Sequence, residues 1–201
     1  MSEAKLLLAT TNQGKIREII RFLEELPLEV YSLSDLDKWE DCKETGTTFL
    51  ENARAKSLFY GQIWDGLALA EDSGLVVDAL NGAPGIFSAR FSGPSSTDHK
   101  NIEKVLALMK GIPQEQRQAN FVSCMVLSKK GRIIQEIQEN ANGYITHKEC
   151  GQYGFGYDPI FFYPPLQKTF AELKPKEKNA VSHRGRALKK LKDFLSGFLY
   201  P

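Results

Sequence analysis

The sequence predicts an α/β fold built on a mixed β-sheet. Apolar strand-like runs alternate with amphipathic helical patterns in the first half of the chain, and a hairpin pattern follows later. Early alternation is typical of parallel strands joined by helices, whereas a hairpin adds antiparallel pairing. The 201 residues are 42% hydrophobic and 25% charged, which fits one globular domain with its own core. We therefore expect a single α/β unit.

The chain begins with a strand, a loop, a helix and a second strand. Residues 5–10 form a continuous apolar run, which is typical of a strand that is buried on both faces. After a polar loop, apolar residues at helical spacing predict a helix that begins near Lys15. Pro27 ends this helix, and residues 28–33 form the second strand.

A second helix and two short strands follow. The capping-box pattern at residues 48–51 starts a helix that runs to about Tyr60. Residues 67–71 and 75–80 are strand-like, and Asp72-Ser73-Gly74 is expected to join them as a connection. Glycine and proline over residues 81–85 then predict a turn.

Four further elements complete the expected α/β unit. They are a helix over 102–109 that ends at Gly111 and Pro113, a central strand over 121–127, a return strand over 132–139 after the turn Lys130-Gly131, and a last helix over 187–198. The last helix is the clearest of all, because its apolar residues form one continuous stripe.

Composition and charge exclude several classes of protein. The 26 basic and 25 acidic side chains leave a net charge of +1, which argues against a general binder of nucleic acid or of membrane surfaces. No apolar run approaches the roughly 18 residues that a membrane span needs, and the first residues carry no targeting signal. Three well-separated cysteines (Cys42, Cys124 and Cys150) indicate reduced thiols in a cytosolic protein.

The loop after the first strand has the features of a phosphate site. Thr10-Thr11-Asn12-Gln13-Gly14-Lys15 places polar groups and a lysine at the start of a helix, where backbone N–H groups favour anions. It is not a Walker A loop, because Ala9 and Ile16 stand where that motif needs glycine and serine or threonine. The alternative is an ordinary polar turn with a solvated lysine.

Two groups of acids could hold a metal ion. Glu44 precedes the second helix, and Glu71-Asp72 is expected at the end of a strand. Carboxylates in such places suit Mg²⁺, which takes one or two of them together with water and substrate phosphates. The alternative is solvated loop charge.

A glycine-flanked aromatic residue points to a base-binding loop. In Gly154-Phe155-Gly156-Tyr157-Asp158-Pro159, the glycines allow the backbone to approach a ligand closely, and Phe155 offers a face for stacking. The alternative is a tight turn with Phe155 in the core. His183-Arg184 is expected just before the last helix. These residue types favour metal-assisted phosphoryl transfer over serine or cysteine hydrolysis, because no nucleophile elbow is present.

Taken together, these motifs resemble those of the inosine/xanthosine triphosphate pyrophosphatase family, whose members hydrolyse nonstandard purine nucleoside triphosphates to monophosphate and pyrophosphate. The matching segments run nearly end to end and keep one order. They are residues 10–15, 44–46, 49–56, 72–75, 82–86, 88–93, 155–161 and 182–184. Many members carry two aspartates where this chain has Glu71-Asp72, so the contribution of Glu71 is left open.

The resemblance implies a role for each matching residue. The phosphate-binding residues would be Thr10, Thr11, Asn12, Gln13, Gly14, Lys15 and Lys56, with Asn12 and Lys15 as side-chain contacts of the loop. Glu44 and Asp72 would hold Mg²⁺, and Asp72 would accept the proton of the attacking water. The remaining substrate contacts would be Ser73, Phe155, Gly156, Tyr157, Asp158, Lys178, His183 and Arg184. Of these, residues 155–158 would bind base and sugar, Lys178 the base or phosphates, and His183-Arg184 the purine edge.

The resemblance also implies a fold and a setting. Residues 1–201 would form one domain, a long mixed β-sheet flanked by helices, with two lobes around a central cleft, in a cytoplasmic homodimer that removes ITP, dITP and XTP from the nucleotide pool. A nucleotide sensor without turnover is the alternative, although a pure binder does not need both Glu44 and Asp72. RNA binding by the basic carboxyl-terminal segment is less favoured, because few aromatic residues interleave there.

Overall fold

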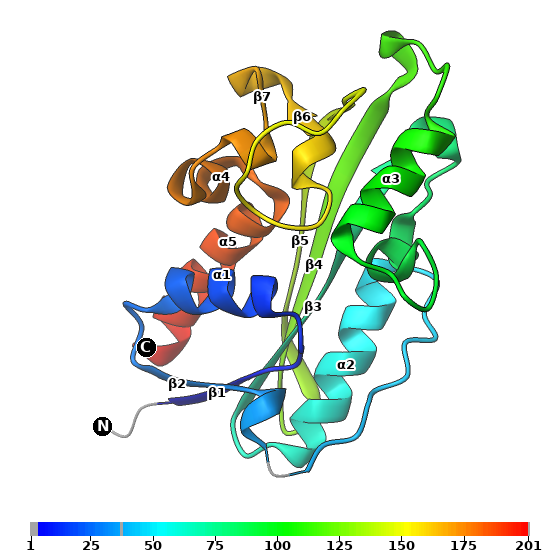
Figure 1. Cartoon of the computed structure of the whole chain (residues 1–201). Coiled ribbons are helices and arrows are strands. Elements are labelled where there is room, and N and C mark those ends of the chain that lie inside the picture. The colour runs from blue at the N-terminus through cyan, green and yellow to red at the C-terminus, as the bar shows by residue number, and fades with distance from the viewer. Residues whose placement is uncertain (1–3, 37, 201) are drawn as a thin grey trace. The chain divides into compact units, whose positions relative to one another are not determined.

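The structure is a computed structural model that describes residues 4–36 and 38–200. Its strands are β1 (Ala4–Leu8), β2 (Leu28–Ser32), β3 (Leu67–Val77), β4 (Gln118–Lys129), β5 (Arg132–Ile145), β6 (Phe161–Tyr163) and β7 (Lys168–Thr169). They form a seven-stranded sheet in the order β2-β1-β3-β4-β5-β6-β7 (Figure 1). β1 pairs in parallel with β2 and β3, whereas β6 pairs antiparallel with β5 and β7. The predicted mixed-sheet α/β fold is confirmed.

The helices are α1 (Gln13–Leu23), α2 (Phe49–Ile63), α3 (Asp98–Leu108), α4 (Pro175–Val181) and α5 (His183–Leu199). None of the helices that the structure describes is both long and apolar enough to cross a membrane. The predicted capping box of α2 is confirmed: Thr48 Oγ1 accepts from the Glu51 N–H at 3.1 Å, and Glu51 Oε2 accepts from the Thr48 N–H at 3.1 Å. These reciprocal bonds satisfy N–H groups that the first helical turn leaves without partners.

The chain divides into two compact units. The first comprises the residues up to Asp72, the segment Ser123–Gln138 and the residues from Ala187 onward, and the second comprises Ser73–Val122 and Glu139–Arg186. Strands β3, β4 and β5 and helix α5 therefore each contribute residues to both units.

The core of the first unit explains the uninterrupted apolar run at the start of the chain. Leu6 and Leu8 of β1 lie in a buried cluster with apolar residues of α1 and α5. Leu7 lies in a separate cluster that includes Tyr60 of α2. Because successive side chains of a strand point to opposite faces, β1 is buried on both sides. The predicted strands over 5–10 and 28–33 are confirmed, with ends at Leu8 and Ser32.

The core of the second unit is rich in aromatic rings. Ile102, Val105 and Met109, from α3 and its carboxyl-terminal end, share a buried cluster with Phe121 and Phe161. The rings of Phe121 and Phe161 lie 4.6 Å apart between centroids. This packing confirms the apolar face that predicted a helix around residues 102–109, and the helix begins earlier, at Asp98.

The predicted break between two strands at residues 72–74 is wrong, because β3 runs unbroken from Leu67 to Val77. Acidic, hydroxyl and glycine residues are typical of turns, but here their polar side chains find partners in the extended strand. Asn52 donates to Asp72, and Arg184 donates to Ser73. Residues 78–80 form a 3₁₀ turn instead of continuing a strand.

The last helix also begins earlier than predicted. α5 starts at His183, so His183 and Arg184 belong to its first turn and do not precede it. The hydroxyl of Ser182 accepts from the Gly185 N–H at 3.1 Å, which is the bond expected of a residue that caps a helix. The hairpin turn at Lys130-Gly131 is confirmed, and both residues have positive φ angles. β5 extends to Ile145, six residues beyond the predicted end.

Candidate active site

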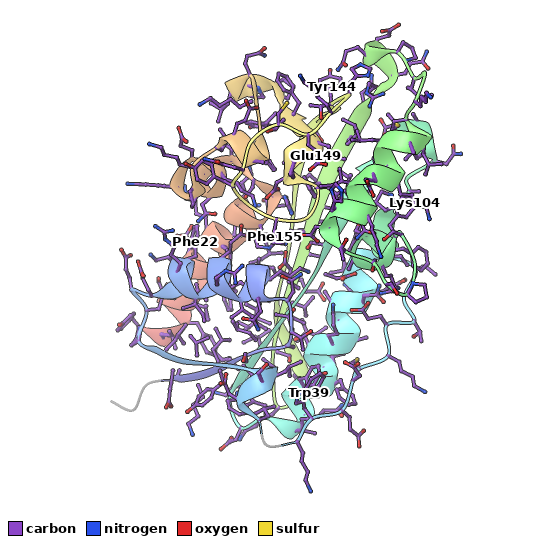
Figure 2. The ribbon with its side chains drawn as sticks, viewed as in Figure 1. Phe22, Trp39, Lys104, Tyr144, Glu149 and Phe155 are labelled. Carbon is purple, nitrogen blue, oxygen red and sulfur yellow. The ribbon has the colours of Figure 1, made fainter. Side chains whose placement is uncertain are left out.

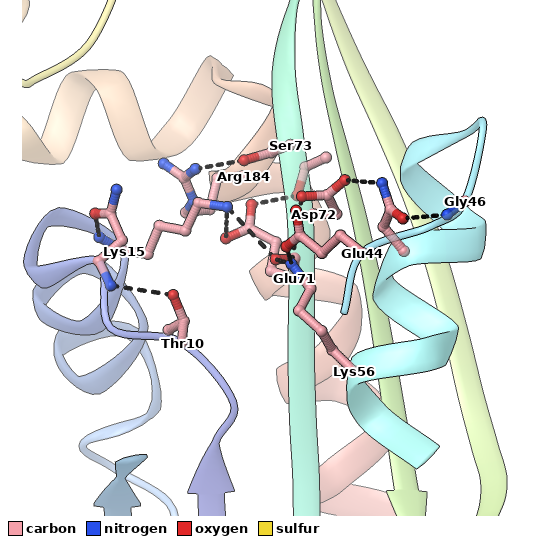
Figure 3. Close-up of polar contacts among 12 residues, drawn as sticks. Thr10, Lys15, Glu44, Gly46, Lys56, Glu71, Asp72, Ser73 and Arg184 are labelled. Atoms are coloured by element: carbon pink, nitrogen blue, oxygen red, sulfur yellow. Dashed lines mark hydrogen bonds and ion pairs between the residues drawn. The ribbon is translucent and has the colours of Figure 1, made fainter. Parts of the chain in front are cut away.

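A lysine and two carboxylates form the centre of the candidate site in the first unit. Lys56 Nζ donates to Glu44 Oε1 at 2.8 Å and to Asp72 Oδ1 at 3.3 Å (Figure 3). It also donates to the backbone oxygen of Glu71 at 3.2 Å. Lys56 is on α2, Asp72 is on β3, and Glu44 is in the loop before α2. The structure therefore brings together three predicted residues that lie up to 28 positions apart in the sequence.

Asn52 is a site residue that the sequence analysis missed. Its side chain is 1% exposed. Asn52 Nδ2 donates to Asp72 Oδ2 at 3.3 Å, and Asn52 Oδ1 accepts from the Gly46 N–H at 2.9 Å (Figure 3). One amide thus connects Asp72 to the loop that carries Glu44. The spacing of four residues between Asn52 and Lys56 places both on one helix face, which is the signal that could have revealed Asn52.

Lys15 joins the same cluster from the phosphate loop. Its Nζ lies 3.4 Å from the backbone oxygen of Glu71 and 3.9 Å from Glu71 Oε2. Glu71 is fully buried, and its Oε1 accepts from the hydroxyl of Ser123 at 2.8 Å. The alternative that Lys15 is merely a solvated lysine is therefore not favoured, because two ammonium groups converge on the backbone oxygen of Glu71. Ser123 was also missed, and no local pattern indicates it.

The loop itself is shaped by the start of α1. Asn12 caps this helix, and its Oδ1 accepts from the Lys15 N–H at 3.0 Å. Thr10 Oγ1 accepts from the Asn12 N–H at 3.2 Å. The side chains of Thr11 and Gln13 are exposed and do not belong to the cluster of Lys15, Glu44, Lys56 and Asp72. The loop therefore presents a helix amino terminus together with a lysine, which are the two features of an anion site.

Burial and neighbouring charges shift the pKa values of two central groups, Asp72 and Lys56. Burial raises the pKa of the Asp72 carboxyl above its usual range, although Lys56 and Lys15 oppose this shift. Burial alone would lower the pKa of Lys56, but the carboxylates of Asp72 and Glu44 outweigh it and raise that pKa above its usual value. Lys56 is thus held as a cation, and Asp72 is a stronger proton acceptor than an exposed aspartate.

A second cluster lies in the second unit, around Phe155. This residue lies in the loop after β5, in which Figure 2 labels Phe155 and Glu149. Lys178 Nζ donates to Asp158 Oδ2 at 2.6 Å, and the same oxygen accepts from the Phe155 N–H at 2.9 Å. Lys178 Nζ lies 4.9 Å from the Phe155 ring centroid. The ring is half-buried and is not part of the core, so the alternative of a core turn is not favoured.

Arg184 and His183 approach this cluster from the first turn of α5. The Arg184 guanidinium carbon lies 5.2 Å from the Phe155 centroid, and Arg184 Nη2 donates to Ser73 Oγ at 3.0 Å. The ring of His183 stacks on Phe121 at 4.6 Å between centroids. Both residues are at least 96% buried. Such fixed side chains can present hydrogen-bonding groups to a ligand with little loss of entropy.

Two other predicted substrate contacts have a different placement. Tyr157 is buried, and its hydroxyl donates to the backbone oxygen of Ser88 at 2.8 Å, so its side chain stabilises the protein interior. Gly156 has a φ of +60° and supplies backbone to the same loop. Its N–H donates to Asp98 Oδ2 at 2.7 Å, and Asp98 is a further residue that the sequence analysis missed.

Glu44 and Asp72 are the residues that could hold a metal ion. Both direct a carboxylate oxygen at one cation, the Lys56 ammonium, so their donor atoms converge as a divalent cation requires. Within residues 4–36 and 38–200, no group of three or more histidine, cysteine, aspartate or glutamate side chains could hold a metal ion. Two carboxylates are a donor set that fits Mg²⁺, whose remaining ligands would be water and phosphate oxygens.

Known proteins resemble this chain over nearly its whole length. The sequence model of the Ham1 family matches residues 6–194. A protein of Photorhabdus laumondii named dITP/XTP pyrophosphatase is 46% identical over 95% of this chain and 98% of its own length. A Bacillus subtilis protein of the same name is 44% identical over 97% and 98%. The solved structure of a HAM1 protein from Coxiella burnetii has a TM-score of 0.86 and 38% identity, and the match covers 96% of this chain and 99% of that one.

Proposed function

Because this chain belongs to the Ham1 family, we propose that it hydrolyses nonstandard purine nucleoside triphosphates such as dITP, ITP and XTP to the monophosphate and pyrophosphate. Relatives named dITP/XTP pyrophosphatase, 44–46% identical over nearly the whole chain, support this substrate class. The observation that carries the proposal is the cluster of Lys15, Glu44, Lys56 and Asp72, which combines two cations that could bind phosphate with two carboxylates that could bind a metal ion.

Glu44 and Asp72 would hold Mg²⁺. When bound, the ion would neutralise phosphate charge and lower the pKa of a bound water. Lys56 already links both carboxylates, so it would remain beside the phosphates as a second source of positive charge. Two carboxylates and one lysine carry a net charge of −1, which leaves the group attractive to a divalent cation.

Asp72 would accept the proton of the water that attacks the α-phosphorus. Its raised pKa suits this task, because a general base works best when its pKa lies near the working pH. Asn52 donates to Oδ2 of the carboxylate and fixes its orientation. Lys15 and Lys56 would stabilise the negative charge that grows on the phosphate oxygens as pyrophosphate leaves.

The cluster around Phe155 would bind the purine. Phe155 offers a ring face for stacking, and the Arg184 guanidinium can only donate hydrogen bonds. Inosine and xanthosine carry an acceptor oxygen at C6, whereas adenosine carries an amino donor there. A site that donates to O6 would leave two donors facing each other when adenine binds, and this arrangement favours discrimination.

The same proposal covers assembly and setting. We infer a homodimer in the cytoplasm that removes deaminated purine nucleotides before polymerases use them. The resemblance in sequence supports this inference, and light scattering during size-exclusion chromatography tests the assembly.

Product analysis with dITP tests the proposed reaction. The protein is incubated with dITP and Mg²⁺, and the phosphorus-containing products are separated and identified. We expect dIMP and pyrophosphate in equal amounts, much slower release from dATP, and loss of both products when Mg²⁺ is chelated. Release of single phosphates would indicate another type of phosphatase. Binding of dITP without any product would indicate a nucleotide sensor and would contradict the proposal.

A further inference from the structure

The loop that carries Phe155 needs outside support to keep one conformation. Gly154 and Gly156 both have positive φ angles, of +75° and +60°. Glycine loses more conformational freedom on folding than any other residue, so a loop with two of them is ordered only at a cost in entropy. The bond from the Phe155 N–H to Asp158 closes the loop on itself, and Lys178 of α4 donates to the same Asp158 oxygen at 2.6 Å.

Two further hydrogen bonds tie this loop to residues 88–98, a stretch of chain far from α4 in the sequence. The Gly156 N–H donates to Asp98 Oδ2 at 2.7 Å, and Asp98 is the first residue of α3. The Tyr157 hydroxyl donates to the backbone oxygen of Ser88 at 2.8 Å. Tyr157 is 5% exposed, so the second bond is sheltered from water. Together the bonds hold the backbone on the carboxyl side of Phe155.

The supporting stretch is itself held firmly. The buried side chain of Asn101 accepts from the Ser92 N–H at 2.7 Å and donates to the backbone oxygens of Ser88 and Ala89, each at 3.3 Å. Lys104, labelled on α3 in Figure 2, donates to the backbone oxygen of Phe91 at 2.7 Å. We call residues 88–101 the platform, because side chains of α3 hold residues 88–92 in place.

We propose that this platform positions the purine-binding loop, and that Asp98 and Tyr157 are positioning residues that set purine affinity and selectivity without contacting the nucleotide. This inference rests on the proposed function, because it needs Phe155 to face a purine. Selectivity depends on the exact place of the stacked base relative to Arg184, so a small loop displacement weakens the correct pairing more than it weakens phosphate binding.

Substitutions at Asp98 separate the hydrogen bond from the charge. Asp98→Ala removes the acceptor for the Gly156 N–H, whereas Asp98→Asn keeps an oxygen acceptor and loses the same negative charge at the start of α3. Tyr157→Phe removes only the hydroxyl of the second bond. Glu103→Gln is the control, because Glu103 is an exposed residue of α3 that pairs with His99. Thermal melting of each variant checks that the fold is retained.

Binding of two ligands by calorimetry, in Mg²⁺ buffer, gives the central readout. IMP carries the purine, and inorganic triphosphate carries only phosphates. We expect Asp98→Ala and Tyr157→Phe to weaken IMP binding about five- to tenfold, the scale of one lost hydrogen bond, and to change the affinity for triphosphate by less than about twofold. Asp98→Asn should stay within about threefold of the unaltered protein for IMP. Across these variants, the ratio of kcat/KM for dITP to kcat/KM for dATP should decrease in parallel with the affinity for IMP.

Three results would overturn the inference. They are unchanged IMP binding in Asp98→Ala, an equal loss in Asp98→Asn, or an equal loss of triphosphate binding. An unaltered protein that binds IMP but does not cleave dITP would refute the proposed function. The positioning inference would remain valid, because it needs only a purine bound at Phe155. If the unaltered protein binds no IMP, the positioning inference is refuted, and product analysis with dITP still decides the proposed function.

Discussion

Replacing Asn52 by alanine tests whether one buried amide organises the carboxylate cluster. The substitution removes the donor to Asp72 Oδ2 and the acceptor for the Gly46 N–H at the same time. Asp72 then keeps Lys56 as a partner, but its carboxylate is free to rotate. The loop with Glu44 loses its tie to β3. We therefore expect effects on both stability and catalysis.

The magnitude follows from the two bonds. Each buried group that loses its partner costs about 1–3 kcal/mol, and water can replace part of this in a site open to substrate. We expect the free energy of unfolding to fall by about 2 kcal/mol, which lowers Tm by about 4–8 °C for a chain of this size. Misplacement of the proposed base should lower kcat for dITP by about tenfold or more, and the Mg²⁺ concentration at half-maximal rate should rise.

A second substitution displaces the amide without removing it. A Cβ atom added at Gly46 would lie 2.7 Å from Asn52 Oδ1 and 2.7 Å from Glu51 Cβ, so Gly46→Ala must push the amide away. It should lower kcat in the same direction as Asn52→Ala. The double variant should be little worse than Asn52→Ala alone, because both changes break the same connection.

Arg54→Ala on the same helix is the matched control. Arg54 makes two exposed hydrogen bonds to Glu136, at 2.6 and 2.7 Å, and surface pairs contribute at most about 1 kcal/mol. Its kcat should match that of the unaltered protein. The reasoning is refuted if Asn52→Ala lowers Tm but leaves kcat and the Mg²⁺ dependence unchanged, because the amide would then serve only the fold.

Four further predictions concern single residues. Burial raises the pKa of Asp72, so ionisation of this carboxyl opposes folding. The protonated carboxyl contributes stability that is complete at a pH below the pKa in the unfolded chain and is lost as the pH rises through the raised pKa. Asp72→Asn should therefore keep or raise Tm at pH 7 while turnover falls at least about 10²-fold, and near-normal turnover would remove Asp72 from the mechanism. Lys15→Ala should raise KM for dITP with a smaller effect on inosine binding, and unchanged kinetics would show that Lys15 does not bind phosphate. Arg184→Ala should lower kcat/KM for ITP far more than for ATP, and equal losses would make it a phosphate contact. Burial raises the pKa of Cys124 to about 12, so mass spectrometry should find it unmodified by iodoacetamide at pH 8 until the protein unfolds.

Local patterns predicted much of the fold because they depend on neighbours in sequence. The capping box at Thr48 and the apolar run that became β1 lie within one element each, and both are confirmed. The same local reasoning failed at Asp72-Ser73-Gly74. Turn propensity there is overruled by partners from α2 and α5, which satisfy the polar side chains within an extended strand.

Residues of the candidate site also divide into those that local sequence predicts and those that only the three-dimensional fold brings together. The residue types and local sequence around Lys15 and Asp72 predict phosphate and metal chemistry, whereas Lys56 is implied only by the resemblance to the family. Ser123 and Asp98 act through contacts to Glu71 and Gly156, which lie 52 and 58 residues away in the sequence. Nothing in the spacing of residues along one chain specifies such long-range hydrogen bonds. They follow only from the arrangement of the strands and loops in three dimensions.

Hydrolysis of dITP in ¹⁸O-labelled water tests the central claim most directly, because it reports which phosphorus atom the water attacks. After a single turnover with excess protein, mass spectrometry locates the label in the two products. If water attacks the α-phosphorus beside Asp72, one labelled oxygen appears in dIMP and none in pyrophosphate. Label in pyrophosphate with unlabelled dIMP would place the attack at the β-phosphorus and would contradict the account.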